Sequence, residues 1–281
     1  MKVEELKRIC SQTRRDIVRM VHAVQSGHPG GSLGCVEFFV ALYYEIMNHD
    51  GKNFTIDGKS EDLFFLSNGH ISPVWYSVLA RAGYFHLKEL STFRFINSRL
   101  QGHPTTHEGL PGVRVASGSL GQGLSVAIGA ALTKKLNKEN NLVYALIGDG
   151  EIEEGQIWEA VMFAAAKKVD NLIVTIDLNG QQIDGATKDV LPIGDVRIKF
   201  EAFGWKTLEI KDGGNIEEVI SVLNAAKTET SKEVPVFIIM HTEMGNGVDF
   251  MMHSHKWHGI APNDEQLANA LGQLEETMGD Y

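Results

Sequence analysis

Short, continuously apolar runs that alternate with longer helical patterns limit the fold of this chain more than any other feature. Three such runs occupy residues 142–147, 172–177 and 234–240. Apolar residues on both faces are typical of strands in a parallel sheet that helices cover on each side, and alternation with helices indicates βαβ units. The runs therefore predict an α/β fold with a doubly wound, mainly parallel sheet, helices on both faces, and a site at the carboxyl ends of the strands.

Helices are predicted where apolar positions recur at steps of three and four residues. This pattern is clearest over residues 3–24, and residues 36–47, 72–83 and 121–136 are predicted as further helices. Residues 263–281 are expected to form one more helix and a tail.

Composition and charge exclude several classes of function. The 281 residues show no internal repeat or linker, so a single domain over residues 1–281 is expected. A formal net charge of −10 argues against a nucleic-acid-binding protein, which would carry a basic stripe. The charged N-terminus predicts no signal peptide, and no run approaches the ~18 apolar residues of a membrane-spanning helix. We therefore expect no contact with a membrane. Because Cys10 and Cys35 show no disulfide or metal-binding spacing, we expect a cytoplasmic protein.

Polar residues follow two of the predicted strands at the point where each ends. Gly148-Asp149-Gly150 comes directly after the run 142–147, and Asn179 follows the run 172–177. If the two strands are neighbours, Asp149 and Asn179 converge. A carboxylate and an amide oxygen suit Mg²⁺, which completes its octahedron with phosphate oxygens and water. Two simple turns are the alternative interpretation.

A glycine-rich segment precedes the predicted helix at 121–136. Gly118-Ser119-Leu120-Gly121-Gln122-Gly123 could cradle a phosphate or a flat ring at a helix N-terminus. Its glycine spacing is the reverse of the dinucleotide-binding fingerprint. By itself the segment is equally compatible with a structural loop.

Four histidines stand beside glycine or proline: His28, His70, His103 and His258. These are loop contexts, where functional side chains are often displayed, and imidazoles can move protons near neutral pH. A histidine bonded only to the backbone explains any one of them, but four in one chain favour a shared role. Residues 253–258 also hold three histidines that could bind a metal, although a mobile polar loop is the simpler interpretation.

Acidic residues cluster at Glu151, Glu153 and Glu154, with Glu159 shortly after. Carboxylates are favoured at a helix N-terminus by the helix dipole, so a structural role is a full alternative to a functional one here.

Together these motifs resemble the thiamine-diphosphate-binding part of transketolases. The histidine loops around His28, His70 and His103, the segment 118–123, the Gly-Asp-Gly to Asn pair and the His-Gly at 258–259 occur in transketolase order. The resemblance covers nearly the whole chain. Gly-Asp-Gly with a later Asn is shared by thiamine-diphosphate enzymes generally, whereas the histidine loops are typical of transketolases.

The resemblance implies a role for each motif. A divalent ion, Mg²⁺ with Ca²⁺ or Mn²⁺ as alternatives, would be held by Asp149, Asn179 and the backbone carbonyl of Gln181. Catalytic roles are implied for His28, His70, His103, His258 and Glu154. Glu154 and Glu159 match acidic positions at the family's subunit interface. Contacts with thiamine diphosphate are implied for His70, Gly118, Ser119, Leu120, Gly148, Asp149, Gly150, Glu151, Asp177, Asn179, Ile183 and His258.

A full transketolase also has a pyrimidine-binding domain and a C-terminal domain, to which the resemblance does not extend. In the family, these supply the glutamate that activates the cofactor and most residues that grip the sugar phosphate. We therefore expect a C-terminal partner subunit and an α2β2 heterotetramer. The implied reaction of the pentose phosphate pathway transfers a two-carbon ketol unit from xylulose 5-phosphate to ribose 5-phosphate or erythrose 4-phosphate.

Other functions fit part of the pattern. A specialised split transketolase could act on a sulfo-sugar or a branched pentose. The α chain of a 2-oxo-acid dehydrogenase would share Gly-Asp-Gly and Asn179 but would not need the loops of His28 and His103. Deoxyxylulose-phosphate synthase has different histidine surroundings. A non-catalytic relative should show broken metal or histidine positions, and none is broken; the glycine spacing disfavours a nicotinamide-binding protein.

Overall fold

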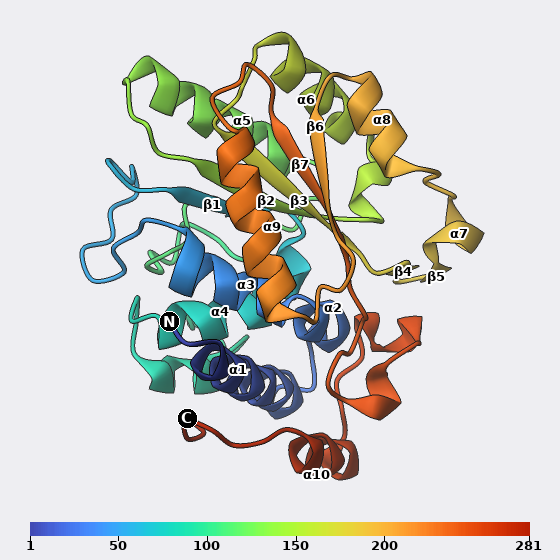
Figure 1. Cartoon of the computed structure of the whole chain (residues 1–281). Helices are drawn as coiled ribbons and strands as arrows, with labels where there is room; N and C mark the ends of the chain where they lie inside the picture. Colours follow the sequence, from blue (N-terminus) through green and yellow to red (C-terminus); the bar gives the residue numbers. More distant parts are fainter.

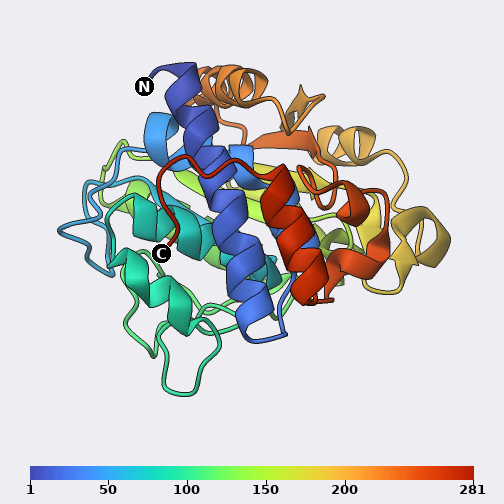
Figure 2. The same cartoon turned by 90° about the horizontal axis from the view of Figure 1, so that it is seen from below.

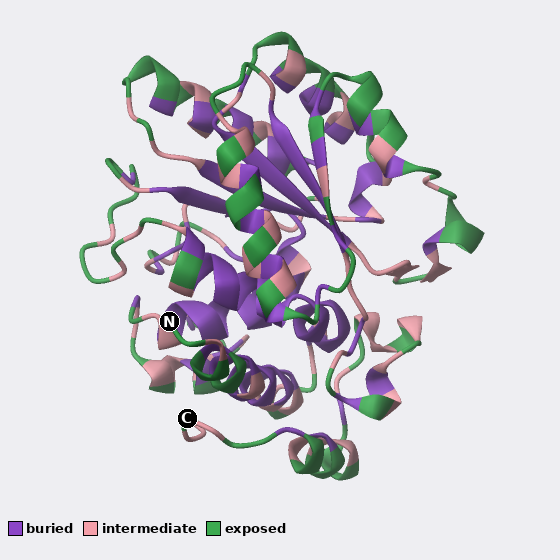
Figure 3. Cartoon of the chain, in the orientation of Figure 1, coloured by how far each residue is buried: buried purple, intermediate pink, exposed green.

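A five-stranded parallel sheet forms the centre of the computed structural model, which describes residues 1–281 (Figure 1). The strand order is β1-β2-β3-β7-β6, and every adjacent pair is parallel. The strands are β1 (Leu63–Leu66), β2 (Val143–Gly148), β3 (Leu172–Leu178), β6 (Lys206–Ile210) and β7 (Val236–His241). The strand β1 is buried along its whole length, and β2, β3 and β7 are buried except at their last residues, as Figure 3 shows. This confirms the predicted α/β fold with a mainly parallel sheet.

Helices cover both faces of the sheet. One face packs against α5 (Gln122–Leu136), α6 (Gly155–Ala166) and α8 (Val196–Ala202) around the smaller apolar core. The other face carries the larger core, with α1 (Val3–Ala23), α2 (Pro29–Gly34), α3 (Val36–Ala41), α4 (Ser72–Arg81) and α9 (Ile216–Glu229). Figure 1 shows α5, α6 and α8 on the opposite side of the strands from α1, α3 and α4.

The predicted elements begin and end close to the observed ones, with two informative differences. The predicted helix at 36–47 is α3 followed by a π-helical turn at Leu42–Ile46. The predicted strand at 234–240 begins only at Val236, directly after Pro235, which has no N–H to donate to a ladder.

The C-terminal segment folds back over the first helix. The helix α10 (Asp264–Gln273) starts with a capping box made by Asn263 and Gln266. The tail after it crosses α1, as Figure 2 shows, and the Asp280 carboxylate accepts hydrogen bonds from Arg15 Nε at 2.9 Å and Nη2 at 2.8 Å. The predicted helix and tail are therefore both present.

Two small elements lie beyond the end of β3. The strands β4 (Gln181–Gln182) and β5 (Gly185–Ala186) form an antiparallel hairpin, and the short helix α7 (Thr187–Val190) follows it.

None of the helices has the length and apolar character needed to cross a bilayer.

Candidate functional site

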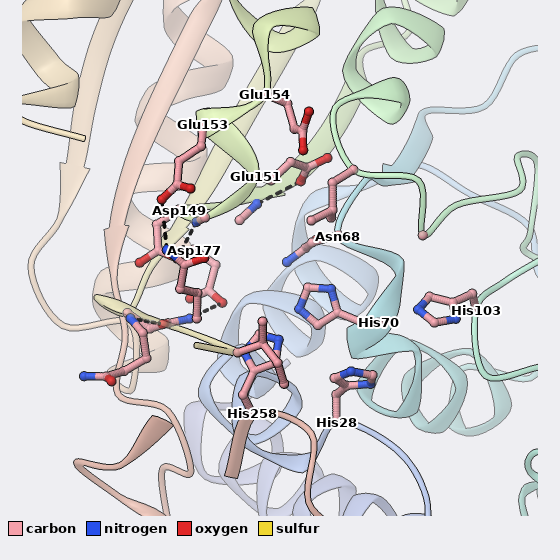
Figure 4. A pocket seen from close by; sticks show the side chains of 18 residues that line it. His28, Asn68, His70, His103, Asp149, Glu151, Glu153, Glu154, Asp177 and His258 are labelled. Atoms are coloured by element: carbon pink, nitrogen blue, oxygen red, sulfur yellow. Dashed lines mark hydrogen bonds between the residues drawn. The ribbon is translucent and has the colours of Figure 1, made fainter. Parts of the chain in front are cut away.

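A polar cleft opens at the carboxyl ends of β1, β2 and β3. It has a volume of about 1010 Å³ including its open mouth, and only two of its 18 lining residues are hydrophobic. Because the three strands are adjacent and parallel, the segments that follow them meet here. Figure 4 shows acidic side chains gathered on one side of the cleft and four imidazoles on the other.

The acidic side is built on neighbouring strand ends. Gly148 of β2 pairs with Asp177 of β3, which brings Asp149 next to the turn that carries Asn179. The Asp149 carboxylate accepts hydrogen bonds from the backbone N–H groups of Gly150 at 2.8 Å and Gly180 at 2.6 Å. The Asn179 amide donates to Asp177 Oδ2 at 2.9 Å. Two carboxylates and an amide oxygen therefore share one small region.

Burial makes this acidic region unfavourable without a cation. Burial and the nearby Asp177 raise the pKa of Asp149 to about 7. Burial also raises the pKa of Asp177, against hydrogen bonds from Thr242, Asn179 and Cys35. A divalent cation would favour the ionised carboxylates. Oxygen ligands of this kind suit Mg²⁺, so the residues present fit the metal that the sequence predicts.

The opposite side of the cleft holds the four histidines. The His28 ring centroid lies 5.1 Å from that of His70, 5.5 Å from that of His258 and 6.1 Å from that of His103. The ring centroids of His70 and His258 are 5.0 Å apart. The Nδ1 atoms of His28 and His258 are buried without a hydrogen-bond partner. The cluster therefore has unused polar capacity close to the cleft.

Burial shifts all four imidazoles toward the neutral form. Burial, together with His258, Arg94 and His103, lowers the pKa of His28 to about 3. Burial is also the main cause of the lowered pKa values of the other three histidines. Neutral imidazoles can both accept and donate a proton, as sugar hydroxyls require.

Comparison with known proteins places this cleft in a family. Residues 6–276 match the family model described as "Transketolase, thiamine diphosphate binding domain". The chain belongs to the transketolase family. The resemblance drawn from the motifs is thereby confirmed, and the matched part is the N-terminal, thiamine-diphosphate-binding part of a transketolase.

Two kinds of transketolase resemble the chain. An apulose-4-phosphate transketolase subunit from Phocaeicola vulgatus is 36% identical over 99% of this chain and 96% of its own length. A 6-deoxy-6-sulfo-D-fructose transketolase subunit from Clostridium is 38% identical over 89% of both chains. The human transketolase is 36% identical over 97% of this chain, which covers only 42% of the human protein.

The transketolase fold is equally clear from solved structures. The crystal structure of transketolase from Campylobacter jejuni superposes with a TM-score of 0.90 at 33% identity, covering 98% of this chain and 43% of that one. The chain thus spans less than half the length of such transketolases.

Every predicted site residue except one lines the transketolase cleft. Ser119 is exposed and lies outside it, whereas its neighbours Gly118 and Leu120 line it. The predicted metal ligands Asp149, Asn179 and Gln181 all line the acidic side. The structure thus brings the predicted set together, while the role of each residue in binding or catalysis stays a prediction.

Glu151 lines the cleft but is engaged by the scaffold. Its carboxylate accepts from the Ser67 hydroxyl, from Gly121 N at 2.8 Å and from Gly148 N at 3.0 Å. It thereby joins the end of β1, the start of α5 and the end of β2. Glu151 thus supports the scaffold of the cleft, and its contact with thiamine diphosphate stays a prediction.

The backbone around His70 and His258 differs from the expected loops. His70 lies in a 3₁₀ turn at Gly69–Ile71, His258 ends another at His255–His258, and His28 directly precedes α2. His28 and His103 both lie in irregular structure, as their loop contexts predicted. His253 pairs with Glu243, and residues 253–258 form no group of three or more metal-binding side chains.

Asn68 and Gln182 line the cleft but were not singled out from the sequence, and Glu153, which the sequence marked only as part of the acidic cluster, lines it as well. Asn68 is buried with its Oδ1 unpaired, and it precedes the His70 turn at the end of β1. Recognising the four-residue strand β1 would have placed it at the same sheet edge as Asp149. Gln182 donates to Glu153 at 3.0 Å, a contact between distant segments that no local pattern encodes.

Proposed function

We propose that this chain binds thiamine diphosphate and Mg²⁺ and, with a partner subunit, transfers a two-carbon ketol unit between sugar phosphates. One observation carries the proposal: a cation-demanding acidic pair and a cluster of four neutral imidazoles face each other across a single cleft. The acidic pair suits a metal-bound diphosphate, and the imidazole cluster suits proton transfer at sugar oxygens.

The cofactor would lie along the cleft with its diphosphate at the acidic side. Asp149, Asn179 and the Gln181 carbonyl would hold the metal, and the histidines His70 and His258 would contact the diphosphate. When bound, thiamine diphosphate supplies the electron sink needed to cleave a ketose next to its carbonyl. The protein's own tasks are to bind it, exclude water and move protons.

The two apolar residues of the cleft have side chains that suit contact with the cofactor rings. Leu120 lies after the Gly118 turn, and Ile183 is 59% exposed at the tip of the β4–β5 hairpin. An aliphatic side chain displayed so openly gains stability when a flat ring or another chain covers it. We infer that Gly118 and Leu120 lie against the aminopyrimidine and Ile183 against the thiazolium.

A partner chain is part of the proposal. The outer faces of α5 and α6 expose the apolar side chains of Val126, Met162 and Phe163, beside a groove that Glu159 also lines. An exposed apolar surface beside a functional cleft is typical of a subunit interface. The relatives named as subunits have nearly the same length as this chain. An α2β2 heterotetramer with a pyrimidine-binding C-terminal subunit would cover this surface.

The sugars remain open within this proposal. Xylulose 5-phosphate as donor with ribose 5-phosphate or erythrose 4-phosphate as acceptor is the first candidate. A second is an unusual sugar, because the two subunit relatives are named for apulose-4-phosphate and 6-deoxy-6-sulfo-D-fructose. The imidazoles can contact hydroxyls common to all these sugars, so discrimination would rest largely with the partner. We place the reaction in the cytoplasm, where the free thiols Cys10 and Cys35 would stay reduced.

The test uses the chain with and without its partner subunit. Ketol transfer from xylulose 5-phosphate is measured with thiamine diphosphate and Mg²⁺ present, and apulose 4-phosphate and 6-deoxy-6-sulfofructose are then offered as donors. Activity only with both chains supports the proposal, and the donor with the highest kcat/KM identifies the sugar. An assembled pair that binds the cofactor but cleaves none of the donors would contradict it.

A further inference from the structure

Arg94 is an arginine without an acidic partner next to the histidine side of the cleft. The buried arginines Arg14 and Arg81 pair with Glu37 and Asp16. Arg94 instead has a half-buried guanidinium whose Nε is buried without a hydrogen-bond partner. Burial lowers its pKa, so the fold keeps this charge at a cost. A charge retained without an ion pair calls for another explanation.

The guanidinium is fixed by contacts on several sides. Its Nη1 donates to Ser26 Oγ at 3.1 Å, and its Cζ lies 5.5 Å from the centroid of the Phe93 ring. It also lies close against Gly102: a Cβ at that position would come within 2.6 Å of Nε. Arg94 itself has a φ of +58°, held by a hydrogen bond from its N–H to Leu100 O at 2.9 Å.

These contacts join two separate segments of the site. Ser26 lies two residues before His28, and Gly102 immediately precedes His103. The Gly102 carbonyl also accepts from Ser72 Oγ at 2.8 Å, so the second segment is anchored to α4 as well. Arg94 is thus the side chain that spans from the His28 segment to the His103 segment.

We propose that Arg94 is a positioning residue for sugar binding, which ties the His28 segment to the His103 segment and places a fixed positive charge beside both imidazoles. The inference rests on the proposed function for its consequence in catalysis, but the tie itself is a property of this chain alone. Arginine suits the task because its planar fork can stack and donate at once, which lysine cannot do.

The charge has a consequence for the histidines. The groups facing His28 are His70, His103, His258 and Arg94, none of them acidic. Arg94 is the second cause, after burial, of the lowered pKa of His103. Removing the charge should therefore make both imidazoles easier to protonate, and removing only the stacking should leave their titration nearly unchanged.

The experiment compares Arg94→Met, which loses charge and fork, with Arg94→Lys, which keeps the charge. Arg99→Met is the matched control, because Arg99 is paired with Glu89 on the surface and does not line the cleft. Histidine ring titrations are followed by NMR in the isolated chain, so neither partner nor activity is needed. We expect the His103 midpoint to rise by about half a pH unit in Arg94→Met, with little change in the other two variants.

The assembled enzyme provides the second readout. Both Arg94 variants should raise the sugar KM by about fivefold, because a neutral-to-charged hydrogen bond and its stacking are lost, while the affinity for thiamine diphosphate stays unchanged. Ser26→Ala should reproduce part of the KM effect without moving the titrations. If Arg94→Met does not fold, Arg94→Lys and Ser26→Ala carry the KM test.

The outcomes separate this inference from the proposed function. Unchanged titrations in a folded Arg94→Met, or an unchanged KM in every variant, would overturn the role of Arg94. A wild-type pair that lacks ketol transfer would overturn the proposed function, and the shift of the His103 midpoint in the isolated chain would still decide whether Arg94 sets the charge of this site.

Discussion

Asp177 Oδ2 accepts a hydrogen bond from Asn179 Nδ2 at 2.9 Å, and this contact fixes which end of the Asn179 amide is available to a metal. With Nδ2 committed to the carboxylate, Oδ1 is turned the other way, where it accepts from Gln181 N at 2.9 Å. Asp177 is in turn held by the Thr242 hydroxyl and the Cys35 thiol. Such supporting contacts orient metal ligands and set their affinity.

Replacing Asp177 with Asn should therefore weaken metal binding, because an amide at this position can no longer enforce the orientation of Asn179. We expect the affinity for Mn²⁺, measured by its paramagnetic signal with thiamine diphosphate present, to fall by about tenfold or more. Asp189→Asn on the exposed helix α7 is the matched control and should bind Mn²⁺ like the wild type. Equal affinities for both variants would contradict the role assigned to Asp177.

Gly118 should not tolerate a side chain. Its φ is +117°, and a Cβ there would lie 2.6 Å from Cδ2 of His103. Gly118→Ala should lower the free energy of unfolding by about 1–3 kcal/mol. It should also weaken cofactor binding, because Gly118 is itself proposed to lie against the aminopyrimidine. Urea denaturation and a cofactor titration measure the two effects.

Gly129 provides the contrast to Gly118 within the same chain. It lies exposed inside α5, and a Cβ there would meet nothing within 4 Å. Gly129→Ala should stabilise the chain by up to about 1 kcal/mol, since alanine is the better helix former. Equal destabilisation by the two substitutions would mean that the close approach at Gly118 is not the cause.

The histidine cluster should make stability depend on pH in a definite direction. The pKa of His28 is about 3 in the folded chain, against an ordinary value of 6.5. Between those values the unfolded chain binds the extra proton, so this contribution to stability is full above pH 6.5 and is lost as the pH falls toward 3. The loss is about 1.4 kcal/mol per pH unit within that window.

His28→Asn removes one such group and should flatten the acid limb of the stability curve. The free energy of unfolding is measured by urea denaturation at a series of pH values between about 4 and 8, a range that spans most of the window between the folded and unfolded pKa values. His86→Asn, on the exposed surface, is the control and should leave the curve unchanged. Parallel curves for His28→Asn and the wild type would show that His28 is not held neutral by the fold.

The exposed apolar face of α5 and α6 should be needed for assembly. Phe163 is 45% exposed and lines the groove between these helices. Phe163→Asp would place a charge in the proposed interface, where burial without a partner is costly. We expect this variant to keep its fold and to lose association with the partner subunit in light-scattering measurements. Ile198→Asp makes the same kind of change at an exposed apolar residue of α8, and this control should assemble normally.

The sequence was most informative where strands are long and apolar. The runs that became β2, β3 and β7 could be recognised because both their faces are buried. The strand β1 has only four residues, too few to distinguish from a helical segment. The edge strand β6 has two buried residues among five and begins with a lysine, so it has no continuous apolar run.

The site was predictable as far as its residues lie in short motifs at strand ends. Asp149 and Asn179 follow recognisable strands, and parallel pairing brings them together. Arg94 could not be found in this way, because its contacts with Ser26 and Gly102 depend on how three separate segments pack. The orientation of Asn179 by Asp177 likewise requires the positions of side chains rather than their order.

The tail that crosses α1 makes the two ends of the chain a single cooperative unit. Asp280 holds Arg15, and the Tyr281 carbonyl accepts from Arg19 Nη2 at 2.9 Å. Local opening usually begins at frayed termini, but here neither end can detach without breaking contacts with the other. Hydrogen exchange in α1 should consequently slow or quicken together with exchange in the last residues, and a change at Asp280 should be felt at the opposite end of the sequence.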